Sequence, residues 1–388
     1  MSISSPMFSP GQTQAKPAPW HIAITVNLKD VVEWGQDAPP DAGAEFDRHD
    51  TVVAIAQALA NDGHVVNVCL ADHTLPQTLL QLRPDFVFNI AEGIGGDARE
   101  AQVPALCELL SIPYTASRVL ANAISLDKTQ TKRIWQSFGL PTPRFQEFFT
   151  SEQILDDRLR FPLFVKPARE GTGMGMGENS IVYNEAELRE QIAWVLATYR
   201  QPALVEEFLA GREFTVGFIG NPGLSLNRRR PELYNEDGYH FFPVLEIDAS
   251  RSVTPTVYGH EAKSLELDEV GAPGYLCPAD IPLSLRLRLM DLTQQAAAAL
   301  NTCDVSRVDF RLDQNGQPYL LELNTLPGLN PSVSDLCIMA KAEGIDYDTL
   351  ITEILYLAAE RFDMPFGIAA ETPAVSQMVA VSYMQPDL

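Results

Sequence analysis

Four polar residues within the stretch 306–329 are of the types that bind a metal ion beside a charged substrate. Asp309, Glu322 and Asn324 offer only oxygen ligands, which suit Mg²⁺ shared with substrate phosphates. Arg307 carries a positive charge that could stabilise negative charge developing next to such a cluster. The alternative is that these side chains form the solvated face of a hairpin, because charged strand faces are usually exposed to water.

Two short strands would position these four residues. Polar and apolar residues alternate over 306–312 and 319–324, and the intervening Asn315-Gly316 is typical of a type I′ hairpin turn. A two-residue turn there predicts that the two carboxylates lie directly opposite each other and that the arginine lies opposite the asparagine. The carboxylates would repel each other unless a cation lay between them. A longer turn would shift this register.

The composition limits the partners of this chain. Its 388 residues, 46% of them hydrophobic, can form two or three lobes with cores of their own. A formal net charge of −23 argues against nucleic acid or an anionic membrane as a partner and favours a small-molecule role. The sequence shows no signal peptide, no run long enough to span a membrane, and five scattered cysteines without a CxxC pair. We therefore expect a reduced, cytoplasmic protein.

The order of the predicted elements divides the chain into lobes. Apolar, β-branched strands alternate with helices near the N-terminus, which predicts a parallel α/β lobe; strands and helices continue in α+β order after it. The predicted segments are a disordered tail at 1–19, an N-terminal α/β domain at 20–124, a central subdomain at 125–206, a C-terminal subdomain at 207–362 and a poorly ordered tail at 363–388.

A lysine-bearing helix and a glycine-rich loop could bind phosphate. The predicted helix 125–139 places Lys128 and Lys132 one turn apart on one face, although a solvated lysine pair is the alternative. Lys166 falls near the end of a buried strand, and the glycine-rich residues 171–177 follow it. This loop is neither a Walker A loop, since no GK[ST] follows, nor a dinucleotide fingerprint, since a strand follows instead of a helix. It could cover a phosphate; a merely flexible loop is the alternative.

Six segments, in the same order along the chain, resemble the ATP-grasp ligases and, among them, the D-alanine–D-alanine ligase branch. They are the lysine helix, VKP with its glycine loop, EEFLAGREFTV, the HEAK loop, SRVDF and LELNTLPGL. The resemblance covers residues 20–362. It implies an α/β (α+β) ATP-grasp fold of three lobes, in which two sheets clamp ATP beside the N-terminal parallel lobe.

The resemblance also implies roles for individual residues. Those implied to contact ATP are Lys128, Lys166, Gly171, Thr172, Gly173, Gly175, Glu206, Glu207, Leu209, Glu213, Phe310 and Leu321. Asp309, Glu322 and Asn324 are implied to bind two Mg²⁺ ions, with Mn²⁺ as an alternative. Those implied to act in catalysis are Arg307, Lys263 and the backbone at Gly328.

The reaction that this resemblance implies is an ATP-dependent ligation. A carboxylate attacks the γ-phosphate of ATP to give an acyl phosphate, and an amine then attacks the acyl carbon and releases phosphate. The partners would be small, amino-acid-like substrates. Ligases of this branch are often dimers, so a homodimer is an open expectation.

The sequence departs from the family pattern in the amino-acid pocket. The segments VNLKDVVEWG and DAGAEFDRHD stand where the family has a glycine-rich segment with a substrate-facing glutamate. Glu92 replaces a histidine, and His260 and Ser264 replace tyrosines that flank the EAK triplet. Ser332 or Ser334 is the candidate for a serine near the carboxylate of the second substrate. These five residues are the candidate substrate contacts, and their departures leave D-alanine, other amino acids or a small acid as substrates.

Two further hypotheses remain open at this point. A kinase-like phosphotransferase would transfer phosphate to a carboxylate or hydroxyl and release no free phosphate. An inactive nucleotide-binding regulatory protein on the same scaffold is the other. The complete set of Arg307, Asp309, Glu322 and Asn324 argues against the inactive protein.

Overall fold

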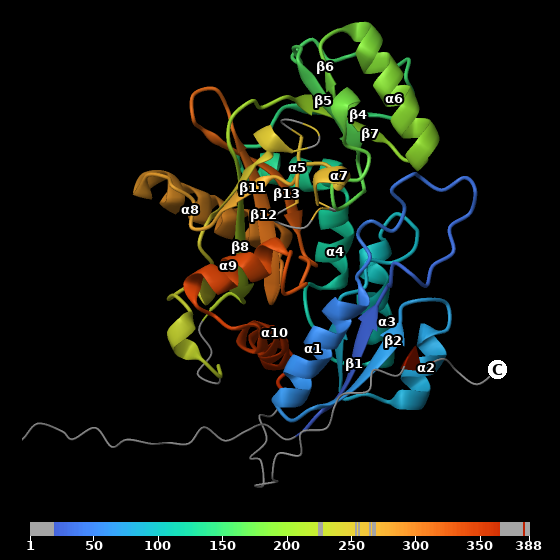
Figure 1. The fold of residues 1–388 in the computed structure, drawn as a ribbon, viewed down its shortest axis with the longest axis vertical. Coiled ribbons are helices and arrows are strands. Elements are labelled where there is room, and N and C mark those ends of the chain that lie inside the picture. The colour runs from blue at the N-terminus through green and yellow to red at the C-terminus, as the bar shows by residue number, and fades with distance from the viewer. Residues whose placement is uncertain are drawn as a thin grey trace, which may run out of the picture.

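The chain folds into three lobes, each built on its own sheet (Figure 1). The computed structural model describes residues 19–223, 228–252, 254, 257–263, 265, 269–364 and 383–384. The predicted tail at 1–19 therefore lies almost entirely outside the described residues. The mixture of parallel and antiparallel sheets confirms the predicted α/β (α+β) class.

The N-terminal lobe is a parallel sheet covered by helices, as predicted. Its strands are β1 (His21–Val26), β2 (Val65–Leu70), β3 (Phe86–Asn89) and β14 (Tyr383–Met384), in the order β14-β2-β1-β3. Its helices are α1 (His49–Asn61), α2 (Leu75–Leu82) and α3 (Gln102–Leu110), with a 3₁₀ turn η1 (Arg99–Ala101). Strand β14 comes from the segment predicted as a poorly ordered tail, and it pairs with Val68 and Cys69 of β2. That tail is therefore structured at least at Tyr383–Met384.

The central lobe is a small antiparallel sheet with one long helix on it, visible at the top of Figure 1. Its elements are β4 (Phe145–Phe148), β5 (Leu163–Pro167), β6 (Ile181–Val182), β7 (Ala203–Glu207), α6 (Glu185–Tyr199) and the 3₁₀ turn η2 (Glu178–Ser180), with strand order β4-β7-β5-β6. Helix α6 begins at the N-cap Asn184, whose side chain accepts a hydrogen bond from the Glu187 amide. The glycine-rich residues 168–177 connect β5 to the 3₁₀ turn η2, which leads directly into β6.

The C-terminal lobe is a larger, antiparallel sheet of six strands. The strands are β8 (Glu213–Gly220), β9 (Tyr239–Phe241), β10 (Leu245–Asp248), β11 (Gly274–Leu276), β12 (Val305–Leu312) and β13 (Pro318–Asn324). The other elements are α7 (His260–Lys263), α8 (Leu283–Leu300), α9 (Asp335–Glu343), α10 (Tyr347–Arg361), η3 (Pro231–Leu233) and η4 (Ala249–Arg251). Helix α10 packs against α1, so the last helix joins the core of the first lobe to the third (Figure 1).

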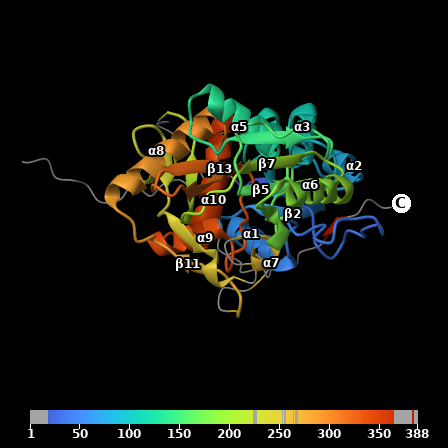
Figure 2. The ribbon, with the colours of Figure 1, turned by 90° about the horizontal axis from the view of Figure 1, so that it is seen from above.

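Two helices link the N-terminal lobe to the other lobes, α4 (Val119–Leu126) and α5 (Lys128–Ser137). Asp127 caps α5 by accepting a hydrogen bond from the Gln130 amide, while Ser125 belongs to α4. Trp135 of α5 is fully buried in the core under the six-stranded sheet, together with residues of α8. Figure 2 shows α5 beside α8 and β13. Helix α5 thus shares a core with the C-terminal sheet, although the sequence assigned it to the central subdomain, so the division at residue 125 remains a proposal.

Strands β12 and β13 have the predicted pairing but not the predicted turn. Asp309 pairs with Glu322, and Arg307 with Asn324, as expected. The connection is longer than two residues, since the Asp313 amide donates to the Gln317 carbonyl, and a bulge after Asp309 restores the register. The turn is not type I′, because only its glycine has a positive φ.

None of the helices among the described residues combines the length and hydropathy needed to cross a membrane.

Candidate active site

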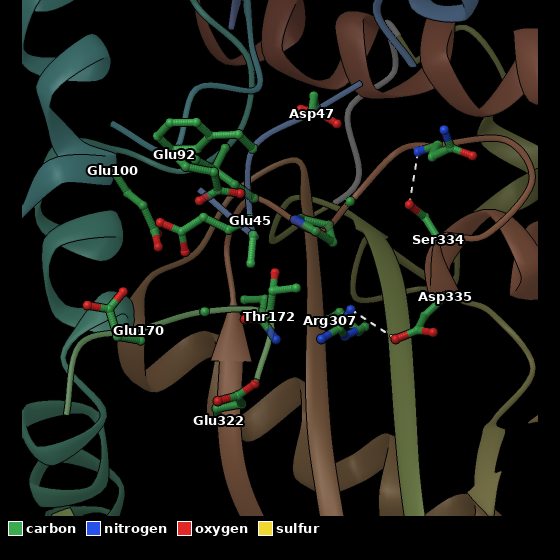
Figure 3. Close-up of a pocket in the computed structure, with 18 of the residues that line it drawn as sticks. Glu45, Asp47, Glu92, Glu100, Glu170, Thr172, Arg307, Glu322, Ser334 and Asp335 are labelled. Atoms are coloured by element: carbon green, nitrogen blue, oxygen red, sulfur yellow. Dashed lines mark hydrogen bonds and ion pairs between the residues drawn. The ribbon is translucent and has the colours of Figure 1, made fainter. Parts of the chain in front are cut away.

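The three lobes meet around a cavity of about 340 Å³. Its lining comes from the loop after β1, the turn after β3, the start of α5, the glycine loop, and strands β12 and β13 with the loop that follows. Figure 3 shows these side chains pointing into a common space. Carboxylates make up a large share of the polar lining, and Lys128 and Arg307 are among the few cations.

The candidate metal ligands gather on the paired strands β12 and β13. Asp309 accepts hydrogen bonds from Thr215 Oγ1 at 2.6 Å and from Asn324 Nδ2 at 3.3 Å. Glu322 Oε2 lies 3.2 Å from Lys128 Nζ. The predicted alternative of a solvated hairpin face is wrong, because Asp309 is buried and the side chain of Glu322 is only 17% exposed.

This arrangement fits a hard divalent cation. Two carboxylates and one amide oxygen project from neighbouring positions of one sheet, and all three are oxygen donors. No group of three or more His, Cys, Asp or Glu among the described residues is placed to hold a metal by itself. The hairpin therefore supplies an open ligand set, which substrate phosphates could complete, rather than a closed protein cage.

Arg307 is held rigidly between two carboxylates. Its Nε and Nη2 lie 2.9 and 3.0 Å from the two Asp309 oxygens, and its Nη1 lies 3.0 Å from Asp335 Oδ2. Burial disfavours its charge, but the two carboxylates outweigh burial and raise the pKa of Arg307 above its usual range. Arg307 therefore presents a fixed positive charge at the edge of the cavity.

Two lysines converge on one buried glutamate between α5 and the central sheet. Glu206 forms ion pairs with both lysines: its Oε2 lies 2.8 Å from Lys132 Nζ and its Oε1 lies 2.7 Å from Lys166 Nζ, and all three residues are buried. Burial alone would raise the pKa of Glu206, but the two ammonium groups lower it to about 2. Lys132 also donates to Thr142 Oγ1. The alternative of a solvated lysine pair is wrong, because Lys128 and Lys132 are both buried.

The glycine-rich loop lies against the candidate site at close range. A Cβ on Gly173 would lie 2.7 Å from the Gly259 carbonyl carbon, and a Cβ on Gly175 would lie 2.4 Å from Pro167 Cγ. Both glycines have positive φ, +69° and +71°, which side chains rarely tolerate. Lys128 Nζ donates to the Glu170 carbonyl at the start of this loop. The loop thus closes over the strand that carries Lys166.

Several predicted nucleotide contacts line a small adjoining cavity of about 40 Å³ under this loop. They are Lys128, Lys166, Gly173, Glu213 and Leu321, next to Asp309 and Glu322. Gly171 and Thr172 line the larger cavity. Glu207 is partly exposed and lies 3.8 Å from Arg144, while Leu209 is half-buried in the segment after β7.

Phe310, a predicted nucleotide contact, lies in the core instead of the cavity. Its side chain is fully buried in the core under the sheet, packed among residues of α8 and β8. Successive residues of a strand point to opposite faces, so Phe310 faces away from the side that carries Asp309. Leu321 lies on the cavity side together with its neighbour Glu322 because the bulge interrupts the alternation.

The candidate substrate and catalytic residues do not all lie at one cavity. Glu92, Gly328 and Ser334 line the 340 Å³ cavity, where a Cβ on Gly328 would lie 2.8 Å from Ser334 Oγ. Ser332 is exposed and is not among the lining residues. His260 lines a separate cavity on the other side of the glycine loop. Lys263 ends helix α7, but its side chain and Ser264 lie outside the described residues.

Some residues of the site were not named individually from the sequence. Glu45, Asp47, Glu100 and Asp335 line the cavity, and Thr215 supports Asp309 from strand β8. The departures in DAGAEFDRHD indicated that the region of Glu45 and Asp47 differs from the family pattern, but not that it reaches the cavity. Thr215 could be identified only through the pairing of β8 with β12.

Comparisons with known proteins agree with this geometry. Residues 134–356 match the family described as the D-ala D-ala ligase C-terminus. A D-alanine–D-alanine ligase of Aquifex aeolicus is 34% identical over 78% of this chain and 92% of its own length. An uncharacterized protein of Sinorhizobium fredii, y4sG, is 34% identical over 84% of this chain and 91% of its own length. The structure of D-alanine–D-alanine ligase from Bacillus anthracis complexed with ATP superposes with a TM-score of 0.64 at 21% identity, covering 89% of this chain and 99% of that chain, which shows the shared fold.

Proposed function

Because this chain belongs to the D-alanine–D-alanine ligase family of ATP-grasp enzymes, which are ATP-dependent ligases, we propose that it joins the carboxylate of one amino-acid-like substrate to the amine of another in the cavity described above. ADP and phosphate are the other products. The observation that carries the proposal is the meeting of Asp309, Glu322 and Asn324 with Arg307 and Lys128 at one end of the cavity. The relatives' own name makes D-alanine the first amino acid to test.

The reaction starts with attack of the substrate carboxylate on the γ-phosphorus of ATP, which forms an acyl phosphate and releases ADP. The ammonium group of the second substrate loses one proton, and the resulting amine attacks the acyl carbon. The tetrahedral intermediate then expels phosphate, and the nitrogen loses a second proton to give the amide. Nothing in this sequence of steps needs a covalent nucleophile of the protein, so the protein contributes positioning and charge.

Each residue of the site has a role in this reaction that follows from its charge and its position. Lys128 and Lys166 hold the phosphates under the glycine loop, and Glu213 holds the ribose. Asp309, Glu322 and Asn324 would hold Mg²⁺, which neutralises phosphate charge when it is bound. Two ions, and Mn²⁺ as a replacement, are part of this proposal. Arg307 and the backbone at Gly328 face the centre where the tetrahedral intermediate forms and stabilise its negative charge.

The decisive experiment is phosphate release from ATP and Mg²⁺ with amino acids offered singly and in pairs, with mass spectrometry of the products. A dipeptide-like amide that forms together with ADP and phosphate is the expected outcome. Formation of a phosphorylated acceptor without free phosphate would show that the protein is a phosphotransferase and not a ligase. Binding of ATP without any turnover would indicate an inactive nucleotide-binding protein.

Glu322→Gln tests the metal ligands. The variant keeps the shape of the side chain but removes a charged ligand, so we expect turnover to be lost while the circular dichroism spectrum is unchanged. Glu152→Gln, which makes the same change at a site on the central lobe that is not part of the cavity lining, is the control. Turnover by Glu322→Gln at the wild-type rate would contradict the metal assignment.

The homodimer and the cytoplasmic location remain proposals. Light scattering on the eluate of a sizing column tests the dimer, and fractionation of cells that produce the chain tests the location.

A further inference from the structure

One wall of the active-site cavity carries carboxylates that the proposed reaction does not use. We call the four residues Glu45, Asp47, Glu92 and Glu100 the acid wall. They come from the loop after β1 and from the segment after β3, both in the N-terminal lobe. Figure 3 shows Glu45, Glu92 and Glu100 pointing toward one another on the side of the cavity away from Asp335.

Two cations near this wall, Arg99 and Lys29, each act on more than one carboxylate. Arg99 lies 2.8 Å from Glu45 and 3.1 Å from Glu170, so one guanidinium serves two carboxylates. Burial raises the pKa of the Asp47 carboxyl to about 7. The positive charge of Lys29 acts in the opposite direction, but its effect is smaller.

Three carboxylates of the wall have oxygens without a partner among the described residues. Neither Glu92 nor Glu100 forms a hydrogen bond or ion pair with any residue that the structure describes. The side chain of Glu45 is 6% exposed, yet its Oε2 is buried without a hydrogen-bond partner among the described residues. Glu92 and Glu100 are half-buried, and carboxylates that are partly removed from water without a cationic partner are unfavourable unless a cation joins them.

The pKa values of Glu92 and Glu100 are raised, as expected for carboxyl groups without a cationic partner. Burial raises the pKa of Glu92 well above its usual range and that of Glu100 to about 7, and neighbouring carboxylates add to both shifts. A cationic ligand would reverse these shifts by pairing with the ionised carboxylates.

An organic ammonium or guanidinium group matches the acid wall better than a metal ion does. Among the described residues, the wall does not form a cluster of three or more carboxylates at metal-binding geometry. The wall also faces the same cavity as Arg307 and Gly328, where the substrate carboxylate would react. A ligand that spans the cavity therefore has its carboxylate at one end and positive charge at the other.

We propose that the substrate whose carboxylate is activated is an amino acid with a second cationic group, an amino or guanidino group, in its side chain. The α-ammonium of a neutral amino acid would pair with one carboxylate, and the second cation pairs with the remaining carboxylates at Glu92 and Glu100. This proposal rests on the proposed ligase function and names its substrate class.

The test compares cationic amino acids with neutral ones of the same shape. Initial rates of ADP formation are measured with ATP, Mg²⁺ and each of lysine, ornithine and arginine, in both enantiomers. Norleucine, norvaline and citrulline are the neutral counterparts, and alanine is included. We expect kcat/KM for the best cationic substrate to exceed that of its neutral counterpart by at least tenfold.

Variants of the wall then link this preference to its carboxylates. Glu92→Gln and Glu100→Gln each should lower kcat/KM for the cationic substrate at least tenfold more than kcat/KM for its neutral counterpart, so that the preference shrinks. Glu152→Gln, which changes the charge of an exposed side chain on another lobe, should leave the preference intact.

The outcomes separate this proposal from the function on which it rests. Turnover of alanine or another neutral amino acid at the highest kcat/KM, with wall variants that affect charged and neutral substrates equally, would overturn the cationic substrate and leave the ligase in place. Absence of amide formation with every amino acid would overturn the ligase itself. A wall variant that fails to fold, judged by circular dichroism, is replaced by Glu92→Asp, which retains the charge and should retain the preference.

Discussion

The buried contact of Glu206 with two lysines allows a quantitative prediction for the variant Glu206→Gln. Glutamine has the same shape but no charge, so Lys132 and Lys166 lose the carboxylate that lies 2.8 and 2.7 Å from them. Both lysines are nearly or fully buried, and breaking a buried ion pair by removing one partner costs about 3–5 kcal/mol.

The cost has an upper limit that depends on pH. Instead of remaining charged without a partner, one lysine can release its proton on folding. With an ordinary pKa of 10.5, this costs about 4 kcal/mol at pH 7.5, that is 3 pH units at about 1.36 kcal/mol each. At pH 9.5 the same step costs only about 1.4 kcal/mol. The destabilisation by Glu206→Gln should therefore shrink as the pH rises.

Thermal unfolding without nucleotide measures this effect. A loss of about 4 kcal/mol lowers Tm by about 8–16 °C in a cooperative unit of 150–250 residues. The matched control is Glu207→Gln at the next position, where the side chain is 32% exposed and lies 3.8 Å from an exposed arginine. Exposed pairs contribute about 0–1 kcal/mol, so its Tm should change little.

Two results would refute this reasoning. One is a Tm for Glu206→Gln within about 2 °C of that for Glu207→Gln at pH 7.5. The other is a difference between the two variants that stays constant from pH 7.5 to pH 9.5, since the proton released by a lysine is the source of the predicted decrease.

Three further predictions concern the metal ligand, the glycine loop and the acid wall. Thr215→Val removes the hydroxyl that donates to Asp309 at 2.6 Å, and it should raise the Mg²⁺ concentration for half-maximal turnover about 10–100-fold; an unchanged Mg²⁺ titration would contradict the supporting role of Thr215. Gly175→Ala places a Cβ 2.4 Å from Pro167 Cγ at a positive φ and should lower Tm and activity, whereas Gly177→Ala, with no atom within 4 Å, should change neither; equal effects of the two would argue against the close packing of the loop. Burial raises the pKa of Asp47 to about 7, so the folded state holds a proton that the unfolded state releases between pH 4 and 7, and stability falls as the pH rises through that window. Asp47→Asn should therefore have a higher Tm than the wild type at pH 8, a gain that disappears as the pH falls toward 4; a gain that does not vary with pH would contradict the assigned protonation.

The lobes and the hairpin were predictable because their signals are local. Alternation over 306–312 and 319–324 indicated two strands, and the spacing of Asp309 and Glu322 indicated that the carboxylates face each other. The predicted turn was wrong and the pairing right, because the bulge after Asp309 compensates for the longer connection. Such a bulge depends on the neighbouring strands and cannot be recognised from the alternation of polar and apolar residues.

Phe310 shows where carrying residues over from a resemblance fails. The motif SRVDF fixed the order of residues, but strand alternation directs Phe310 into the core and away from the cavity. The alternation of the strand, applied to this residue, would have been sufficient to exclude it.

By itself, the sequence determined the ligase fold, the pairing of Asp309 with Glu322 and the departures from the family in the amino-acid pocket, because each of these depends on short continuous runs of residues. Only the tertiary structure decided that Lys132 is a buried partner of Glu206, and that Glu45 and Glu100, 55 positions apart in the numbering, share one wall of the cavity with Glu92. The charge of a buried group depends on which side chains surround it, and the fold brings those side chains together from distant parts of the chain.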